Sequence, residues 1–181
     1  TEGGHFYAKE LVSQIEDMNN GKYLNNVIES SHTSSFCIGV AGYPEKHIES
    51  PSLQTDLIRL KEKVEAGADY VVTQMFFDNQ KYFEFVKAAK DMGINIPIIP
   101  GIKPIAVKKH LQLLPQVFKI DLPQELINDV QSCKSNKDVR NVGVEWAIQQ
   151  SKELLAAGVP VLHYYSMGKS DNIKKIASAI F

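Results

Sequence analysis

A glutamine stands inside an apolar stretch of this chain, and its amide could bind a ligand. Gln74 follows the apolar residues 70–72 and Thr73, and the apolar residues 75–77 follow it. A buried amide lowers stability when its hydrogen bonds are left unmade. It can, however, both donate to and accept from a ligand ring with the complementary pattern. The residues alone leave open that the amide instead bonds neighbouring backbone.

Polar and aromatic residues also end three other apolar runs. The first run ends at Tyr43, with His47 in the segment that follows, and the third ends in "PGIKP" at 100–104. The fourth run carries His163, Tyr165, Ser166 and Lys169. If the runs are parallel strands of a barrel, their carboxyl ends form the rim on which such proteins place their active sites. Four polar ends on one rim favour a ligand site that includes Gln74.

The four runs predict strands over 35–43, 69–77, 96–102 and 159–167. None of them alternates apolar with polar residues, so we expect both faces of each strand to be covered, as in a parallel sheet.

Helical patterns occupy the segments between these strands. Leu53, Leu57, Leu60 and Val64 recur at the spacing of one helix face, which predicts a helix that ends near Gly67. Further helices are expected over 6–17, 82–89 (closed by Gly93), 105–114, 139–157 and 171–180, with a break at 115–125 and a surface loop at 19–26.

Strands joined by helical crossovers of this length are βα units. The absence of G-x-G-x-x-G favours a (β/α)8 barrel over a dinucleotide-binding sheet. A complete barrel takes about 250 residues, so the 181 residues supply about four units. We expect a single domain over 1–181, with a leading helix and loop at 1–34 and four βα units at 35–181.

Composition excludes several classes of protein. The net charge is −1, with 44% hydrophobic and 23% charged residues, so no binding to nucleic acid or membrane is expected. The five histidines are scattered and no C-x-x-C occurs, which argues against a zinc site. Cys37 and Cys133 are expected as reduced thiols in a cytoplasmic protein. The chain begins with Thr1, so we expect a processed chain or a piece of a longer one.

The motifs "GYPEKH" (42–47), "DLIRLKEKVEAGADYVVTQMFFD" (56–78), "PIIPGIKPI" (97–105) and "VLHYYSM" (161–167) resemble methylenetetrahydrofolate reductase. The similarity runs from about Phe6 to the carboxyl end. It implies the last four units of a flavin-dependent (β/α)8 barrel that reduces 5,10-methylenetetrahydrofolate with NADH or NADPH. The family's catalytic glutamate belongs to an earlier strand, so the resemblance implies no catalytic acid after Thr1 and an inactive fragment.

The resemblance also assigns binding residues. Gln74 would bond the substrate's pterin where nicotinamide also binds, with Tyr165 as a pocket wall. Lys169 stands where some relatives have an arginine for the glutamate tail of folate. The residues that would contact FAD are Tyr7, Ala8, Tyr43, His47, Asp56, Arg59 and Lys63.

Two other functions remain open at this point. A four-stranded half barrel exposes two edges and its inner surface, so the chain could be a non-catalytic module that self-associates, and a homo-oligomer is expected. An aldolase would need a Schiff-base lysine inside a strand, and none of the predicted strands has an interior lysine.

Overall fold

A computed structural model describes residues 4–24, 32–168 and 170–181. Within these residues, four parallel strands pair in chain order. They are β1 (Gly39–Gly42), β2 (Tyr70–Met75), β3 (Ile98–Ile102) and β4 (His163–Tyr164). Consecutive parallel strands with helical crossovers confirm the α/β class and the four βα units of a (β/α)8-type fold.

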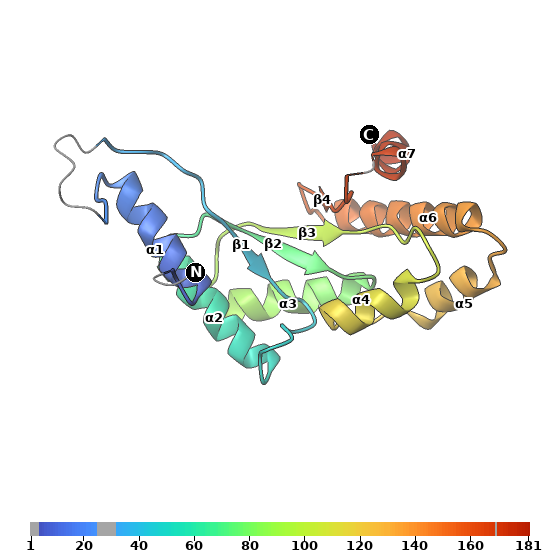
Figure 1. Ribbon diagram of the computed structural model, residues 1–181, viewed down its shortest axis with the longest axis horizontal. Helices are drawn as coiled ribbons and strands as arrows, with labels where there is room; N and C mark the ends of the chain where they lie inside the picture. The colour runs from blue at the N-terminus through green and yellow to red at the C-terminus, as the bar shows by residue number, and fades with distance from the viewer. Residues whose placement is uncertain (1–3, 25–31, 169) are drawn as a thin grey trace.

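Helices precede and connect the strands (Figure 1). Figure 1 shows α2 and α3 along one side of β1 and β2, and α6 beside β4 at the other end of the sheet. The helices of the described residues are α1 (Ala8–Asn19), α2 (Leu53–Glu65), α3 (Asn79–Asp91), α4 (His110–Phe118), α5 (Gln124–Ser132), α6 (Asn136–Ala156) and α7 (Asp171–Ile180).

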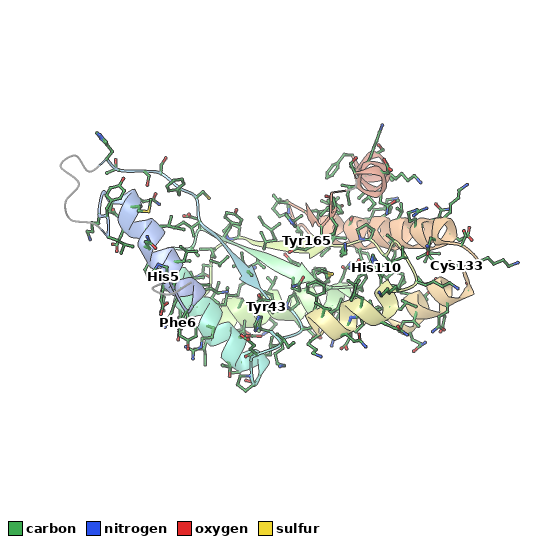
Figure 2. The ribbon with its side chains drawn as sticks, viewed as in Figure 1. His5, Phe6, Tyr43, His110, Cys133 and Tyr165 are labelled. Atoms are coloured by element: carbon green, nitrogen blue, oxygen red, sulfur yellow. The ribbon has the colours of Figure 1, made fainter. Side chains whose placement is uncertain are left out.

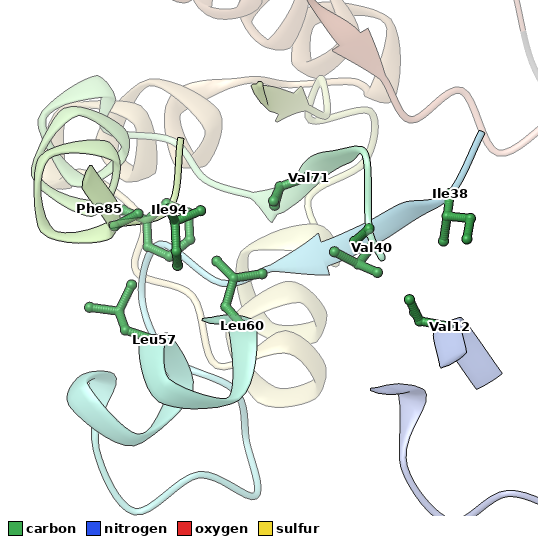
Figure 3. Close-up of a cluster of buried hydrophobic side chains, with 10 residues drawn as sticks. Val12, Ile38, Val40, Leu57, Leu60, Val71, Phe85 and Ile94 are labelled. Carbon is green, nitrogen blue, oxygen red and sulfur yellow. The ribbon is translucent and has the colours of Figure 1, made fainter. Parts of the chain in front are cut away.

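The amphipathic pattern of α2 explains how this helix is held on the sheet. Ser52 caps it by accepting the N–H of Thr55, which satisfies a free donor of the first turn. Leu57 and Leu60 are buried in one hydrophobic cluster with residues of α1, α3, β1 and β2. Figure 3 shows Leu57 below Phe85 and Ile94, and Leu60 between Leu57 and Val40. The glycines expected to end α2 and α3 do follow them, with positive φ angles at Gly67 and Gly93.

The sheet is covered on one face only, contrary to the expectation from the apolar runs. Burial alternates along β1 and β2, with Val40, Val71 and Thr73 buried and their neighbours more exposed. The buried face packs on the helices. Side chains of a strand alternate between faces, so the other face, which would line a barrel interior, is the more open one in this chain.

The long connection between β3 and β4 differs most from the prediction. Helix α4 begins at His110 instead of 105, and Ile105 lies in the preceding segment, where it is buried in a second cluster with Met75 and Leu114. The supposed break at 115–125 ends α4, with Lys119 in the left-handed conformation, and starts α5 directly after Pro123. Proline is compatible with the start of a helix. Pro123 therefore precedes a new helix inside the segment that was predicted as a break.

Strand β4 is also shorter than the predicted 159–167. Only His163 and Tyr164 are assigned as strand, paired with Gly101 and Ile102, and the N–H of Tyr165 extends the contact to the carbonyl of Ile102. This strand has one neighbour in the described sheet, and Pro160 has no N–H with which to lengthen the ladder.

None of the helices in the described residues is long and apolar enough to cross a membrane. Both cysteines are free thiols, with Cys37 exposed and Cys133 buried. The predicted loop at 19–26 lies within the described residues only up to Leu24.

Candidate functional site

A cavity of about 460 Å³ lies where α1, α2 and the carboxyl end of β1 meet. Its lining includes all seven residues that the resemblance assigned to a cofactor, which come from three separate segments of the chain. These residues are Tyr7, Ala8, Tyr43, His47, Asp56, Arg59 and Lys63.

The start of α1 presents two aromatic rings to this cavity. Phe6 and Tyr7 both line it and are largely exposed. The Glu10 carboxylate accepts the backbone N–H groups of both residues, at 2.9 and 3.2 Å, and these bonds lower the pKa of Glu10. Glu10 therefore fixes the backbone that carries the two rings. Phe6 was not among the residues predicted for the site, although its position beside Tyr7 was a usable signal.

The segment after β1 forms another wall. The Tyr43 and His47 rings meet edge to face with centroids 4.6 Å apart, and the Asp56 carboxylate accepts the N–H of His47. Burial raises the pKa of Tyr43, and the charge of Asp56 adds to that effect. Asp56 thus ties the loop that follows β1 to helix α2.

Opposite charges alternate on the α2 wall. Glu62 pairs with Lys9 and Arg59, both at 3.0 Å, which joins α1 to α2. Lys63 donates to the carbonyl of Ala41, and burial lowers the pKa of Lys63. The cavity offers cationic donors, but Glu62 already pairs with two of them, Lys9 and Arg59. Lys9 and Glu62 were not among the residues predicted for the site.

The predicted substrate residues lie at the same edge of the sheet, but outside the lining of this cavity. Gln74 is the penultimate residue of β2 and Tyr165 directly follows β4. The Tyr165 hydroxyl donates to the carbonyl of Thr73 at 2.8 Å, which places Tyr165 beside the end of β2. The Gln74 side-chain oxygen accepts the N–H of Met75 at 3.0 Å, so part of the backbone-bonding alternative is realised while the amide NH₂ is left for another partner.

The residues predicted for the cofactor and those predicted for the substrate are adjacent at this edge of the sheet. Figure 2 shows Tyr43 beyond the tip of β1, and Tyr165 lies close enough for the charge of Tyr43 to raise its pKa, after the larger effect of burial. Tyr43, Gln74 and Tyr165 therefore gather at one end of the sheet. Lys169 lies outside the described residues.

Lys103, in the predicted polar strand end "PGIKP", has a largely buried side chain, which was not predicted from the sequence. Lys103 directly follows β3 and is only 8% exposed. Its pKa is lowered by burial. Burial also lowers the pKa of His110, and the charge of Lys103 adds to that effect. None of the predicted strands has an interior lysine, and Lys103 falls one residue beyond β3. Among the described residues, no group of three or more His, Cys, Asp or Glu side chains could hold a metal ion.

Comparison with known families gives one match over almost the whole chain. The family model described as methylenetetrahydrofolate reductase matches residues 1–180.

Individual relatives agree with this match. The chain is 39% identical to "Methylenetetrahydrofolate reductase (NADH) 1" of Arabidopsis thaliana, an alignment that covers 99% of this chain and 29% of that protein. It is 33% identical to a probable methylenetetrahydrofolate reductase (NADPH) of Caenorhabditis elegans, over 93% of this chain and 26% of the relative. It is 32% identical to the 5,10-methylenetetrahydrofolate reductase of Pectobacterium carotovorum subsp. carotovorum, over 94% of this chain and 53% of the relative. The chain thus spans between a quarter and about half of the length of these proteins.

A solved structure shares the fold. It is an uncharacterized protein from Clostridium thermocellum that binds two copies of 5-methyl-5,6,7,8-tetrahydrofolic acid, with a TM-score of 0.52 and 21% identity over 80% of this chain and 52% of that chain.

Proposed function

Because the chain belongs to the methylenetetrahydrofolate reductase family, we propose that the full-length protein containing it reduces 5,10-methylenetetrahydrofolate to 5-methyltetrahydrofolate. The electrons come from NADH or NADPH through FAD, in the cytoplasm, as a step of one-carbon metabolism and methionine biosynthesis. In this proposal residues 1–181 form one domain, a leading helix and loop (1–34) with four βα units (35–181), and the enzyme is a homo-oligomer that binds neither nucleic acid nor membrane.

The observation that carries this proposal is the cavity beside β1, in which seven residues from separate segments line one space. Their chemistry fits a flavin dinucleotide: Lys63 and Arg59 donate to phosphate oxygens, the Asp56 carboxylate accepts from ribose hydroxyls, and the ring of Tyr7 stacks on a base. When bound, FAD supplies the transfer of hydride between nicotinamide and folate.

The remaining residues of the edge serve the substrate. Gln74 holds the pterin by its free amide donors, and Tyr165 forms the wall beside it, fixed by its bond to Thr73. Lys169 binds a carboxylate of the glutamate tail as a point charge, without the bidentate fork of arginine. The proton donor for the folate nitrogen belongs to another part of the protein, so residues 1–181 alone are inactive.

The full-length gene product tests this function. We expect it to be purified with a flavin absorbance band and to oxidise NADH or NADPH when methylenetetrahydrofolate is added. Replacing Gln74 by Ala should raise the KM for folate while the flavin content stays unchanged. A colourless protein that takes up no added FAD would contradict the proposal.

The open inner face of β1 and β2 supports a second candidate, a non-catalytic half barrel that associates with another copy of itself. Sedimentation of residues 1–181 separates the two: self-association that buries this face requires a dimer, and a compact monomer would refute this second candidate.

A further inference from the structure

Lys103 has a largely buried side chain whose ammonium group has no partner in the described part of the chain. The residue is 8% exposed, yet no hydrogen bond or ion pair of its side chain to any described residue is observed. Its Nζ is not among the fully buried atoms that lack a partner, so the packed stem presents the ammonium group at an accessible surface. The described residues supply no acceptor for this held ammonium group, and the inference starts from that observation.

The position of Lys103 directs it toward the open face of the sheet. Ile102 is buried among residues of α3, α6 and α7 on the helix-covered side. Gly101 faces the other way, because a Cβ at Gly101 would touch the Tyr165 ring. Side chains alternate along a strand, so Lys103 follows Gly101 onto the inner side, at the same edge as Gln74.

His110 supplies a second donor near this lysine. Its Nδ1 accepts the N–H of Ala106 at 3.2 Å, so in the neutral ring the proton resides on Nε2, which is then a donor. The charge of Lys103 reaches the imidazole, since it contributes to the lowered pKa of His110. Two donors, one of them charged, therefore lie near one another with no acceptor recorded for either Lys103 Nζ or His110 Nε2 within the described residues.

Helix α6 holds this arrangement in place. Gly143 of α6 lies so close to the segment after Lys103 that a Cβ there would meet the carbonyl oxygen of Ile105 at 2.0 Å. Ile105 is itself buried in the cluster with Leu114 of α4. The backbone around Lys103 is therefore packed from both sides, which is the rigid support that a binding residue needs.

We propose that Lys103, assisted by His110, binds an oxyanion of the ligand that enters the open face, either a carboxylate or a phosphate. The identity of the ligand rests on the proposed function. In that function the carboxylates are those of the glutamate of folate, and the phosphate is that of the nicotinamide nucleotide. The presence of the oxyanion site rests only on the geometry.

Matched ligands test the site in the full-length protein. One pair is 5-methyltetrahydrofolate and 5-methyltetrahydropteroate, which lacks the glutamate; the other is reduced nicotinamide mononucleotide and its riboside, which lacks the phosphate. Lys103→Met should weaken the anionic member of one pair at least about tenfold, as expected for the loss of a hydrogen bond to a charged group, and leave its neutral counterpart unchanged. The affected pair identifies the source of the anion.

Two variants control this experiment. Lys103→Arg keeps the charge and should retain part of the preference for the anionic ligand, whereas Lys109→Met removes an exposed charge nearby and should change neither pair. Equal losses for charged and neutral ligands, or no loss in Lys103→Met, would overturn the assignment.

A titration of the wild-type protein tests the site without any organic ligand. Lysines labelled with ¹³C-methyl groups give an NMR signal for Lys103 that Lys103→Met removes. Inorganic phosphate should raise the pKa of this lysine, because an anion favours the charged form; an unchanged pKa overturns the oxyanion site. If wild type binds neither folate nor nicotinamide compounds, the proposed function fails, while the phosphate titration still decides the oxyanion site.

Discussion

The Tyr165 hydroxyl donates to the Thr73 carbonyl over 2.8 Å, joining β4 to β2 across the strand between them. Gly101 of β3 lies beneath this bond and donates its N–H to the Thr73 hydroxyl at 2.9 Å. A Cβ at Gly101 would lie 2.3 Å from the Thr73 carbonyl oxygen and 2.7 Å from the Tyr165 ring. The carboxyl edge of the sheet therefore closes only because residue 101 has no side chain.

Replacing Gly101 by Ala should destabilise this edge more than removing the tyrosine hydroxyl. Tyr165→Phe loses one hydrogen bond, about 1 kcal/mol of unfolding free energy. Gly101→Ala forces backbone apart, and overpacking of this kind costs roughly 1–3 kcal/mol or more. Urea unfolding measures both.

Gly39→Ala is the comparison variant for that experiment. The three atoms nearest to its Cβ would all belong to the Tyr70 side chain, and a side chain can move where a carbonyl cannot. A loss in Gly39→Ala as large as that in Gly101→Ala would show that backbone crowding is not the cause.

The extent to which the sequence predicted this edge depends on the range of the interactions. The spacing of Leu57 and Leu60 predicted α2, because the periodicity of a helix is a local pattern. The resemblance placed Tyr43 and Lys63, which do line one cavity. The bond from Tyr165 to Thr73 spans 92 residues, and no local pattern encodes it.

Two errors have a similar origin. Apolar runs indicate that a strand can be covered on both faces, but not that this chain supplies both covers. The open inner face followed only from the half-barrel interpretation and not from the runs themselves. Lys103 entered the prediction only as part of the polar strand end "PGIKP", and its burial arises from the packing of α4 and α6, which follow later in the chain, around that segment.

Glu45 should make stability depend on pH. Its Oε2 accepts the N–H of Asp121 at 2.6 Å, whereas its Oε1 is buried with no hydrogen-bond partner among the described residues. Burial raises the pKa of Glu45 from 4.5 to about 7; the charges of Asp121 and Asp78 also raise it, while the Asp121 N–H and Lys81 lower it.

The sign of the effect follows from proton binding. Between pH 4.5 and 7 the folded protein keeps a proton that the unfolded chain has lost, so the free energy of unfolding falls as pH rises through this window and then levels off. Glu45→Gln removes this contribution, and its stability relative to wild type should grow by about 1–2 kcal/mol from the lower to the upper limit, less than the full shift would give because the side chain is partly exposed. Parallel stability curves for the two proteins would contradict the prediction.

Lys63→Met should weaken flavin binding in the full-length protein. Lys63 lines the cavity, and a charge-assisted bond to a phosphate oxygen contributes enough that its loss lowers affinity about tenfold. Lys61→Met is the matched control, because Lys61 lies on the same helix outside the cavity and pairs with Glu65 at 3.9 Å. Flavin fluorescence titration measures both dissociation constants, and equal values for the two variants would argue against the cavity as the flavin site.

Gly143→Ala should damage the oxyanion site from a distance. Its Cβ would meet the Ile105 carbonyl oxygen at 2.0 Å and the Ile105 nitrogen at 2.8 Å, so α6 must move away from the segment that carries Lys103. We expect the unfolding free energy to fall by roughly 1–3 kcal/mol, together with a loss of the phosphate-dependent shift in the pKa of Lys103. Asn141→Ala, an exposed change in the same helix, should stay within about 0.5 kcal/mol of wild type and keep that shift. Retention of the phosphate response in a destabilised Gly143→Ala protein would mean that Lys103 does not need α6 for its position.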